Sequence, residues 1–594
     1  MSQLLKGILG LLIMCMSLTA QAQKGPGGVS TETAGNSNNK VWLKADGIVN
    51  GNATPADNTL VQTWQDESLS AIANSPFQNT VGQRPLLRTL PGQGINNRPV
   101  IKFNGLNQRL LFNTSDDING NGPYDARTTY IVFRTGNNVN TRQMIYEQGG
   151  NVRGLNIYIE NGNLIMGAYN QVTSDGPYDA WQYQFISTTI SPNTPYIITH
   201  VFDATSPGPD PNDPATYTGT ITGFLNGVQF GSTTGVGRLY TQPGLGAVNN
   251  FTVLNDNVSD DTPAYLNGDI AEIIQYEGVL NEAERIIVEN YLGAKYIANP
   301  IGNDKYEYQL RYGYEVIGVG RQTVGNEHTI SQGQNIFEIK VNAANLDDDD
   351  YLLAGHNNQP ISSWTTTGAP DAGVNFRVLE RSWQFDHTND VGAVDITLDV
   401  STLPALASGD AKYVILLDKS GGPIPNYENS STEIIELVNT TGSLYQTTGL
   451  TIPKGTFVTI GEVIPTAQFA SSESYEFETT TPANSVIARL NYTPASDVTI
   501  NYQVTGGTAT NGGTDYDIAS TGTLTFAAGQ KTNNLSIVLN DDLLAESTET
   551  VTFNLPSVVT PGVVIGSISN HTFNIYDNDA PPKFNFAVST SSIA

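Results

Sequence analysis

The sequence predicts an all-β protein built from tandem β-sandwiches. Short apolar runs alternate with clusters of Asn, Gly, Asp and Pro along most of the chain, which is typical of strands joined by turns. The 594 residues include 58 Gly and 27 Tyr, and 39% are hydrophobic, a composition that favours strands and turns over long disordered segments. At about 150 residues per domain, several domains are expected.

The charge balance excludes two classes of partner. Asp and Glu number 57 and Lys and Arg 28, so the net charge is −29. Binding to nucleic acid or to an anionic membrane needs clustered Lys and Arg, and neither partner is expected. Beyond the N-terminal segment, no apolar run approaches the roughly 20 residues of a transmembrane helix.

Residues 1–22 have the pattern of a secretory signal peptide. Lys6 is followed by an apolar run and by the small-residue cleavage sequence Ala20-Gln21-Ala22. Cys15 is the one cysteine of the sequence and lies in this segment, so the exported chain would lack disulfides and would need other stabilising elements, such as metal ions. We therefore expect an extracellular or outer-surface protein. Residues 23–40, rich in Gly, Ser, Thr and Asn, are expected to be a linker.

Residues 41–300 are expected to form the first sandwich. Three of its apolar runs have clear strand character: Pro99–Phe103, Thr129–Phe133 and Tyr196–Val201. A helix is expected between Leu280 and Tyr296, because Asn281 can cap it and Glu284 completes a capping box.

Two further β domains follow. Residues 301–464 continue the same rhythm, with regular alternation in the run 393–400, and predict a smaller β domain. Residues 465–580 contain at least five alternating runs, which predicts an immunoglobulin-like sandwich. Residues 581–594 repeat the Pro-to-Phe spacing that opens this third domain, so we expect them to be the start of a further, truncated copy.

The densest acidic pattern lies in the third domain. Four acids fall within nine residues, and a second acidic group closes the domain: Asp541, Asp542, Glu546 and Glu549, then Asp577 and Asp579. Such a cluster suffers like-charge repulsion unless a cation is bound, and carboxylates at short, irregular spacing suit Ca²⁺. A solvated turn on an acidic protein is the alternative interpretation.

The third domain also carries a family resemblance. Five motifs occur in order: Glu478, Gly513-Thr-Asp515-Tyr516, Gly522–Phe526, a D-D-x-x-x-E-x-x-E run from Asp541, and Asp577-Asn578-Asp579. The domain therefore resembles the Calx-beta domain, a calcium-binding β-sandwich. The resemblance implies calcium ligands at seven positions: Glu478, Asp541, Asp542, Glu546, Glu549, Asp577 and Asp579. Asn578 and Gly506 stand where the family has acids, so we expect weak, structural binding, at about 10⁻⁴–10⁻³ M.

The first sandwich is similar to concanavalin A-like, laminin-G-type domains. The matching segments are Val41–Asp46, Thr63–Asp66, Arg98–Gly105, Phe224–Val228 and Gly268–Glu272. Such domains bind glycans or proteins, or act as spacers, and some relatives are hydrolases with an E-x-D-x-x-E strand. That triplet is missing from the sequence. We expect structural or solvated roles for the nearest acids, Asp269, Glu272 and Glu277, and no catalytic residues.

Three weaker signals complete the candidates. The run 117–122 matches the opening of an EF-hand loop, but position 128 is Thr instead of Glu, which favours a β turn. The four acids at 347–350 are interpreted as a solvated loop. Trp181, with Tyr178, Tyr183 and Phe185 nearby, is equally consistent with a sugar-stacking platform and with a core position.

The leading hypothesis is a secreted or cell-surface protein, similar to multidomain proteins of Gram-negative bacteria. Calcium would stiffen the Calx-beta module, and the N-terminal lectin-like domain would bind an extracellular glycan or a surface protein in adhesion. Two alternatives remain open, a polysaccharide-active hydrolase and a structural spacer in a larger surface protein.

Overall fold

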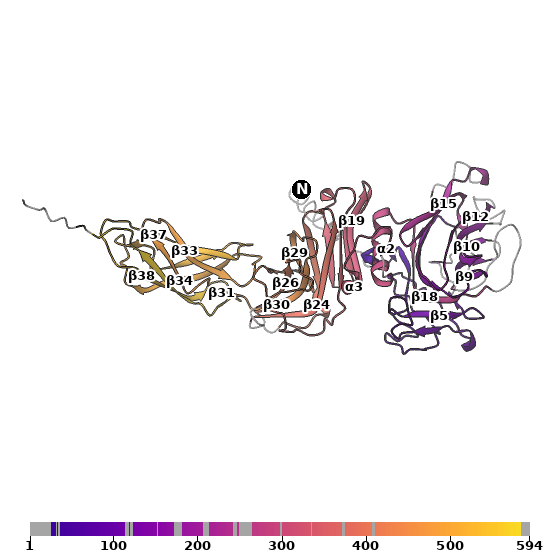
Figure 1. Ribbon diagram of the computed structural model, residues 1–594, viewed down its shortest axis with the longest axis horizontal. Helices are drawn as coiled ribbons and strands as arrows, with labels where there is room; N and C mark the ends of the chain where they lie inside the picture. Colours follow the sequence, from indigo (N-terminus) through magenta and orange to yellow (C-terminus); the bar gives the residue numbers. More distant parts are fainter. Residues whose placement is uncertain are drawn as a thin grey trace, which may run out of the picture. The chain divides into compact units, whose positions relative to one another are not determined.

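The computed structural model describes residues 25–583, apart from 31, 34–35, 113–117, 119–122, 151–152, 171–180, 206–212, 241–245, 249–263, 298–299, 334–335, 371–374, 407–409 and 582. The chain divides into two compact units, which are described separately. The first consists of Met1–Asn358, Trp383–Asp399 and Thr448–Lys454, and the second of Gln359–Ser382, Val400–Thr447 and Gly455–Ala594. Figure 1 shows the strands and helices of the chain in sequence colours. The predicted signal peptide and almost all of the predicted repeat at 581–594 lie outside the described residues.

The described chain is nearly all β, as predicted. In the first unit, a two-sheet sandwich begins at residue 39. Its larger sheet has the order β15-β14-β13-β8-β18-β5-β4, with β3 also paired to β18, and its smaller sheet the order β12-β11-β10-β9-β17-β6. The strands of the larger sheet are β3 (Asn39–Lys44), β4 (Leu86–Arg88), β5 (Val100–Asn104), β8 (Ala126–Thr135), β13 (Pro195–Asp203), β14 (Gly219–Leu225), β15 (Val228–Val236) and β18 (Asn267–Glu277). Those of the smaller sheet are β6 (Leu110–Leu111), β9 (Gln143–Gly150), β10 (Arg153–Glu160), β11 (Asn163–Asn170), β12 (Trp181–Thr189) and β17 (Gly246–Val248).

Short elements accompany this sandwich. Two small strand pairs are present in the described residues: β1 (Glu32–Thr33) with β2 (Asn36–Ser37), and β7 (Pro123–Tyr124) with β16 (Leu239–Tyr240). Single helical turns occur at η1 (Pro26–Gly28), η2 (Val81–Gln83) and η3 (Pro214–Thr216).

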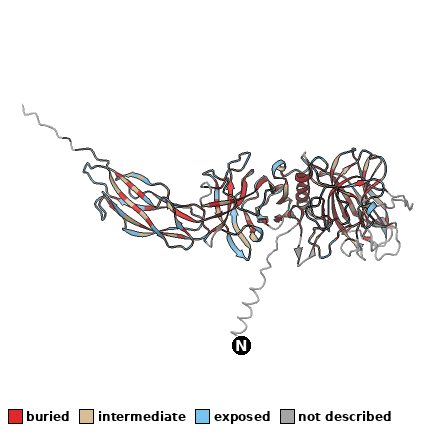
Figure 2. Ribbon diagram, turned by 90° about the horizontal axis from the view of Figure 1, so that it is seen from below, coloured by how far each residue is buried: buried red, intermediate tan, exposed pale blue. Residues whose placement is uncertain are grey.

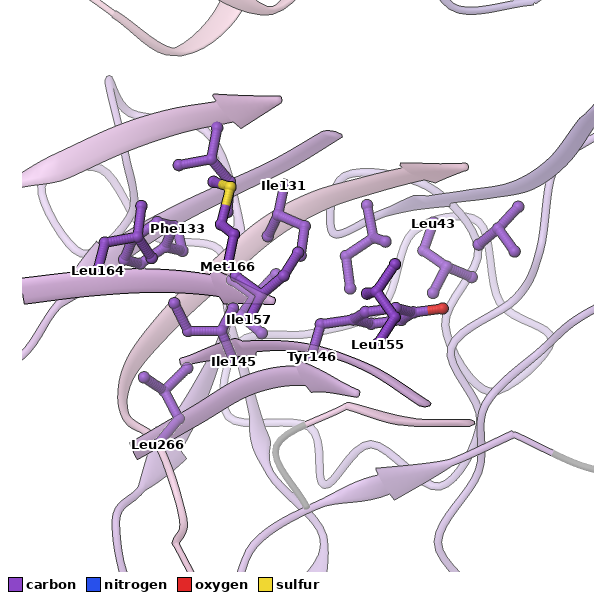
Figure 3. Close-up of a cluster of buried hydrophobic side chains, with 14 of the residues drawn as sticks. Leu43, Ile131, Phe133, Ile145, Tyr146, Leu155, Ile157, Leu164, Met166 and Leu266 are labelled. Carbon is purple, nitrogen blue, oxygen red and sulfur yellow. The ribbon is translucent and has the colours of Figure 1, made fainter. Parts of the chain in front are cut away.

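The core of the sandwich lies between the two sheets. Figure 3 shows Ile131 and Phe133 of β8 packed with Ile157 of β10 and Met166 of β11, all of them buried. Alternate residues of these strands point into this core because side chains on a strand alternate between its two faces. Burial of this apolar surface is the main stabilising contribution in the unit.

The predicted helix is α2 (Glu282–Tyr296). Its capping box is confirmed: the Glu284 amide donates to the Asn281 side chain at 3.1 Å, and the Asn281 amide donates to the Glu284 carboxylate at 3.1 Å. Figure 2 shows α2 coloured as buried along most of its length. The helix is covered on several sides because β13, β19 and η1 all pack against it.

The N-terminal residues differ from the predicted linker at 23–40. Residues 25–30 are buried or half-buried and form η1, which packs against α2, β19 and β21. Gly27 and Gly28 have φ of 71° and 76°, and a Cβ on Gly28 would lie 1.9 Å from the Ser331 Oγ. Glycines suit this segment because the backbone needs left-handed conformations in a space without room for a side chain. Strand β3 begins at Asn39, so the last two residues of the predicted linker are also ordered.

The predicted domain at 301–464 contributes strands to both units. Described residues of the first unit include α3 (Gln309–Tyr312), β19 (Tyr314–Thr323), β20 (Asn326–His328), β21 (Ile330–Gly333), β22 (Phe337–Val341), η4 (Ala343–Asn345), β23 (Asp350–His356) and β25 (Val394–Asp399). Here β19 lies between β20 and β23, and β22 lies between β21 and β25. β24 (Phe376–Thr388) pairs with β23 from Trp383 onward. The alternation predicted for 393–400 is present in β25, where Val394, Ile396 and Leu398 are buried.

In the second unit, β26 (Lys412–Asp418) pairs with β27 (Glu433–Glu436) and with β30 (Phe457–Val463). β28 (Val438–Thr441) pairs with β29 (Leu444–Leu450), and η6 (Val400–Thr402) is a single turn. None of the helices in the described part of the chain has the length and apolar character that a membrane crossing requires.

The predicted third domain is a sandwich of two five-stranded sheets within its described residues. One sheet has the order β35-β37-β33-β31-β39 and the other β32-β40-β38-β34-β36. The strands are β31 (Thr466–Phe469), β32 (Glu473–Phe477), β33 (Ala483–Leu490), β34 (Val498–Gly507), β35 (Tyr516–Asp517), β36 (Thr521–Phe526), β37 (Thr532–Leu539), β38 (Glu549–Val558), β39 (Val564–Ile565) and β40 (Asn570–Tyr576). The alternating apolar residues of β34, β36, β37, β38 and β40 are mostly buried between the sheets, as predicted.

Candidate metal centre

The acids of the third domain gather at one end of its sandwich because of the strand directions. β32 and β40 are parallel neighbours, so Glu478 and Asp577, which follow them, emerge at the same edge. β38 runs antiparallel to β40 and begins there with Glu549. In the other sheet, β35 pairs with the end of β37, which brings Asp515 beside Asn540. Four chain segments that are distant in sequence therefore meet at this end.

The first group of carboxylates consists of Glu478, Asp577 and Asp579. One carboxylate oxygen from each lies within 4.8 Å of the others. The Asp579 amide donates to the Asp577 Oδ1 at 2.6 Å, and the Asn578 amide to the Glu478 Oε1 at 3.5 Å. The Asp579 Oδ2 is shielded from solvent and has no hydrogen-bond partner among the described residues.

The second group consists of Asp515, Glu546 and Glu549, again with one oxygen from each within 4.8 Å of the others. The Asp515 Oδ2 accepts a hydrogen bond from the Thr510 amide at 2.6 Å. Glu546 is exposed, and its main-chain amide donates to the Asp577 Oδ2 at 2.5 Å, which joins the two groups.

A small hollow lies among these side chains. Its volume is about 10 Å³, close to one water-sized sphere. Six of its lining residues are acids: Glu478, Asp515, Asp542, Glu546, Glu549 and Asp577. A space of this size, lined by carboxylate oxygens, suits a single ion or water and is too small for an organic ligand.

The pKa values of two carboxyl groups in the site are raised by burial and by repulsion from neighbouring acids. Burial raises the pKa of Glu478, and the charges of Asp577, Asp579 and Asp541 raise it further. Burial and the neighbouring Asp515 carboxylate raise the pKa of Glu549 to about 7. Both shifts show that carboxylate charge is disfavoured here when no cation is present.

The donor set fits a hard divalent cation. All candidate ligand atoms are carboxylate oxygens, which Ca²⁺ prefers, and Ca²⁺ accepts six to eight of them in flexible geometry. The unpartnered, shielded Asp579 Oδ2 is a second observation in favour of this fit, because a buried carboxylate oxygen without a partner is costly.

The seven calcium ligands implied by the sequence do not all belong to the two carboxylate groups. Five of them belong to the two groups: Glu478, Glu546, Glu549, Asp577 and Asp579. Asp542 lines the hollow and accepts the Leu544 amide at 2.7 Å. Asp541 belongs to neither group, and its Oδ1 accepts a hydrogen bond from the Asn578 side chain at 2.9 Å.

Asp515 is the residue that the sequence reasoning missed. Its Gly-Thr-Asp-Tyr motif contributes to the family resemblance, but the ligand set that the resemblance implies does not include it. The signal was available in that motif, since an acid immediately before a short strand can reach the same sandwich end as the acids on the neighbouring strands.

The other sequence candidates have structural partners or lie outside the described residues. Most of the EF-hand-like loop at 117–122 and Tyr178 lie outside them. In the 347–350 run, the Asp350 carboxylate accepts the Asp347 amide at 2.6 Å and Asp349 pairs with Lys305 at 2.7 Å. Trp181 is a core residue, 3% exposed.

Residues 464–579 match the model of the Calx-beta domain family. This span is a Calx-beta domain. Residues 288–456 match a second family, described as Domain of unknown function (DUF8202), and that match begins inside α2. A search of curated proteins found no significant match.

Solved structures of Calx-beta domains are similar to this chain. The apo-form Calx CBD1 domain is 22% identical over 20% of this chain and 99% of its own, with a TM-score of 0.18. The calcium binding domain CBD12 of CALX1.1 is 23% identical over 19% of this chain and 44% of its own, with a TM-score of 0.18.

A structure of another kind is also similar to this chain. The binding domain of botulinum neurotoxin serotype G is 12% identical over 67% of this chain and 82% of its own, with a TM-score of 0.26.

Proposed function

We propose that this chain is a secreted or cell-surface binding protein whose Calx-beta domain is stiffened by Ca²⁺. The observation that carries the proposal is the pair of three-carboxylate groups joined through the Glu546 amide and Asp577, beside the unpartnered Asp579 oxygen. Bound Ca²⁺ would supply positive charge that offsets the repulsion between these acids and would connect four separate chain segments. Glu478, Asp577 and Asp579 would hold it on one side, and Asp515, Glu546 and Glu549 on the other.

The N-terminal sandwich is proposed as the recognition module, of the concanavalin A-like, laminin-G type, acting on a glycan or surface protein. Support comes from β12, where the Tyr183 and Phe185 rings stack with centroids 5.2 Å apart and an interplanar angle of 18°. Phe185 is 49% exposed. An exposed ring stacked on a half-buried one, on a sheet, suits the apolar face of a sugar ring.

A binding role is favoured over hydrolysis because the acids of β18 have structural partners. Glu272 accepts four hydrogen bonds, from the Trp42 indole, the Tyr291 and Tyr296 hydroxyls and the Lys295 ammonium group, at 2.7–2.9 Å. Asp269 pairs with Arg134 at 2.6 Å, and Glu277 pairs with Lys40 at 3.1 Å.

Calorimetric titration of the full chain with Ca²⁺, after treatment with chelator, tests the calcium proposal. We expect binding that weakens about tenfold or more in Asp515→Asn, because calcium affinity depends on the number of charged ligands. Glu473→Gln is the matched control, since Glu473 is an exposed acid at the start of β32, four residues before the strand end that carries the site. Equal binding by Asp515→Asn and the parent would remove Asp515 from the ligand set, and no binding by the parent would refute the calcium proposal.

A glycan array probed with the parent and with Phe185→Ala tests the recognition proposal. Retention on neutral glycans that is lost in the variant would support it. Release of reducing ends from a polysaccharide by the parent chain would instead favour the hydrolase, and failure to bind any glycan or surface protein would favour the spacer.

A further inference from the structure

The first unit contains a second and much larger hollow, a cleft of about 550 Å³. It lies between the loop after β3, the turn before β5, helix α2 and the start of β19. Its volume is in the range of small-molecule binding sites, about 300–1,000 Å³. Its lining includes charged and aromatic side chains: Lys44, Asp46, Glu67, Arg98, Tyr314 and Glu315.

Two of the cations in the cleft already have acidic partners. Lys44 pairs with Glu67 at 2.9 Å. Lys295 pairs with Asp46 at 3.0 Å and with the buried Glu272 at 2.9 Å. The positive charge of these lysines is therefore offset within the protein.

Arg98 differs from both lysines. Its guanidinium lies over the Tyr314 ring, 3.6 Å from the ring centroid. Within the described part of the chain, this guanidinium has no hydrogen bond to a side chain or carbonyl and no ion pair. Stacking occupies one face of the guanidinium and leaves the N–H groups at its edge able to bind a ligand.

Arg98, Tyr314 and His356 form a stack on one side of the cleft. The His356 ring stacks on Tyr314 with an interplanar angle of 18°. The His356 Nδ1 accepts the Asn358 amide at 3.0 Å, so its Nε2 carries the proton and donates to the Glu315 carboxylate at 3.2 Å. Glu315 has φ of 47°, a left-handed backbone that non-glycine residues rarely adopt. The hydrogen bond from His356 supports this strained backbone at Glu315. The same His356 ring stacks on Tyr314, so the ring under Arg98 is fixed before any ligand binds.

The polar groups of the cleft define the chemistry of a ligand. A stacked guanidinium with a free edge binds a carboxylate through two parallel hydrogen bonds. The side chains of Asp46, Glu67 and Glu315 are 21–30% exposed and can accept hydrogen bonds from hydroxyl groups. These acids would repel a doubly charged phosphate more strongly than a singly charged carboxylate. A ligand with one carboxylate and several hydroxyls satisfies both requirements.

We propose that this cleft binds a uronic-acid unit of an acidic glycan, with the Arg98 guanidinium donating hydrogen bonds to its carboxylate. The proposal rests on the proposed glycan recognition by the first unit, and it is independent of calcium binding by the Calx-beta domain. It names a site separate from the Tyr183–Phe185 pair.

Calorimetric titration of the full chain with digalacturonic acid tests the proposal, with α-1,4-galactobiose as the neutral match and inorganic phosphate as the anion control. Chelator is present throughout, because Ca²⁺ binds uronates directly. We expect digalacturonic acid to bind at least tenfold more tightly than either control. Equal binding of galactobiose would overturn the role of the carboxylate, equal binding of phosphate would overturn the sugar assignment, and no binding of digalacturonic acid would overturn the site.

Three variants locate the binding. Arg98→Gln should weaken binding of digalacturonic acid about tenfold or more, because a charge-assisted hydrogen-bond pair is lost. Arg98→Lys keeps the charge without the planar fork and should fall between the parent and Arg98→Gln. Lys102→Gln removes an exposed cation on β5 and should leave binding unchanged. Parent-like affinity in a folded Arg98→Gln would overturn the proposal. Retained Ca²⁺ binding and retained neutral-glycan binding in that variant would show that the failure concerns the cleft alone.

Discussion

The main-chain amide of Glu546 donates a hydrogen bond to the Asp577 carboxylate across 2.5 Å. Through this contact, the loop between β37 and β38 is held against the segment that follows β40. Glu546 belongs to one three-carboxylate group and Asp577 to the other. The same residue pair therefore orders the loop and brings the two acidic groups together.

This contact predicts different effects of Asp577→Asn with and without calcium. In millimolar Ca²⁺, the variant should lose most of the increase in melting temperature that Ca²⁺ gives the parent, because a ligand that binds the folded state stabilises it by mass action. In chelator, the variant should melt close to the parent. The side-chain amide can accept only one of the two main-chain hydrogen bonds that Asp577 accepts, from Glu546 and Asp579, and the removal of one repelling charge offsets that loss.

Differential scanning fluorimetry of the full chain measures both effects, with Glu473→Gln as the control. A Ca²⁺-dependent shift in Asp577→Asn equal to that of the parent would contradict the prediction.

The strand pattern of the Calx-beta domain was predictable because its two faces differ so clearly in polarity. Alternation along β37 and β38 places every second residue in the core, and the structure confirms this. The acids between these strands were predictable as a group for the same reason, since polar runs that interrupt alternation lie at the sandwich ends. The distances between individual acids were not predictable. The Asn578 side chain donates a hydrogen bond to Asp541. Asp515 reaches the other acids because β35 pairs with β37.

Composition did not predict that residues 25–30 are packed against the rest of the first unit. A Gly-rich stretch has few apolar side chains, which indicates a linker when burial is judged by side chains alone. Here the buried group is the backbone itself: the Ser331 hydroxyl donates to the Gly27 carbonyl at 3.1 Å, and the Tyr276 hydroxyl to the Val29 carbonyl at 2.9 Å. These contacts join residues hundreds of positions apart and leave no periodic signal in the sequence.

Gly28→Ala should destabilise the first unit and expose its N-terminal segment to protease. The left-handed φ of 76° costs alanine about 1–2 kcal/mol, and its Cβ would meet the Ser331 hydroxyl. Gly51→Ala is the matched control, because Gly51 has φ of 75° but nothing within 4 Å of an added Cβ. Limited proteolysis followed by mass spectrometry should detect faster cleavage before residue 40 in Gly28→Ala than in Gly51→Ala. Equal cleavage rates would show that the close packing of η1 contributes little.

Glu272→Gln should lower the stability of the first unit by about 3 kcal/mol. The variant places an amide where four donors converge and leaves Lys295 with Asp46 as its remaining acidic partner, and breaking a buried ion pair costs about 3–5 kcal/mol. Asp348→Asn removes an exposed acid from the same unit and should change stability by less than about 0.5 kcal/mol. Urea unfolding followed by tryptophan fluorescence measures both values, since the Trp42 indole binds Glu272 directly. Parent-like unfolding of Glu272→Gln would indicate that this network is dispensable for the fold.

His200 of β13 should make the first unit sensitive to acid. Its side chain is fully buried and neither ring nitrogen has a hydrogen-bond partner within the described residues, so burial lowers its pKa from 6.5 to about 3. The unfolded chain then binds a proton below pH 6.5 that the folded chain does not, and stability is present above pH 6.5 and falls as the pH decreases toward 3. The loss should be about 1.4 kcal/mol for each pH unit below 6.5. Urea unfolding at pH 7.5, 5.5 and 4.5 should show a smaller decline in His200→Gln than in the parent, because glutamine does not titrate. Identical pH dependence in the two proteins would show that His200 gains its proton without unfolding.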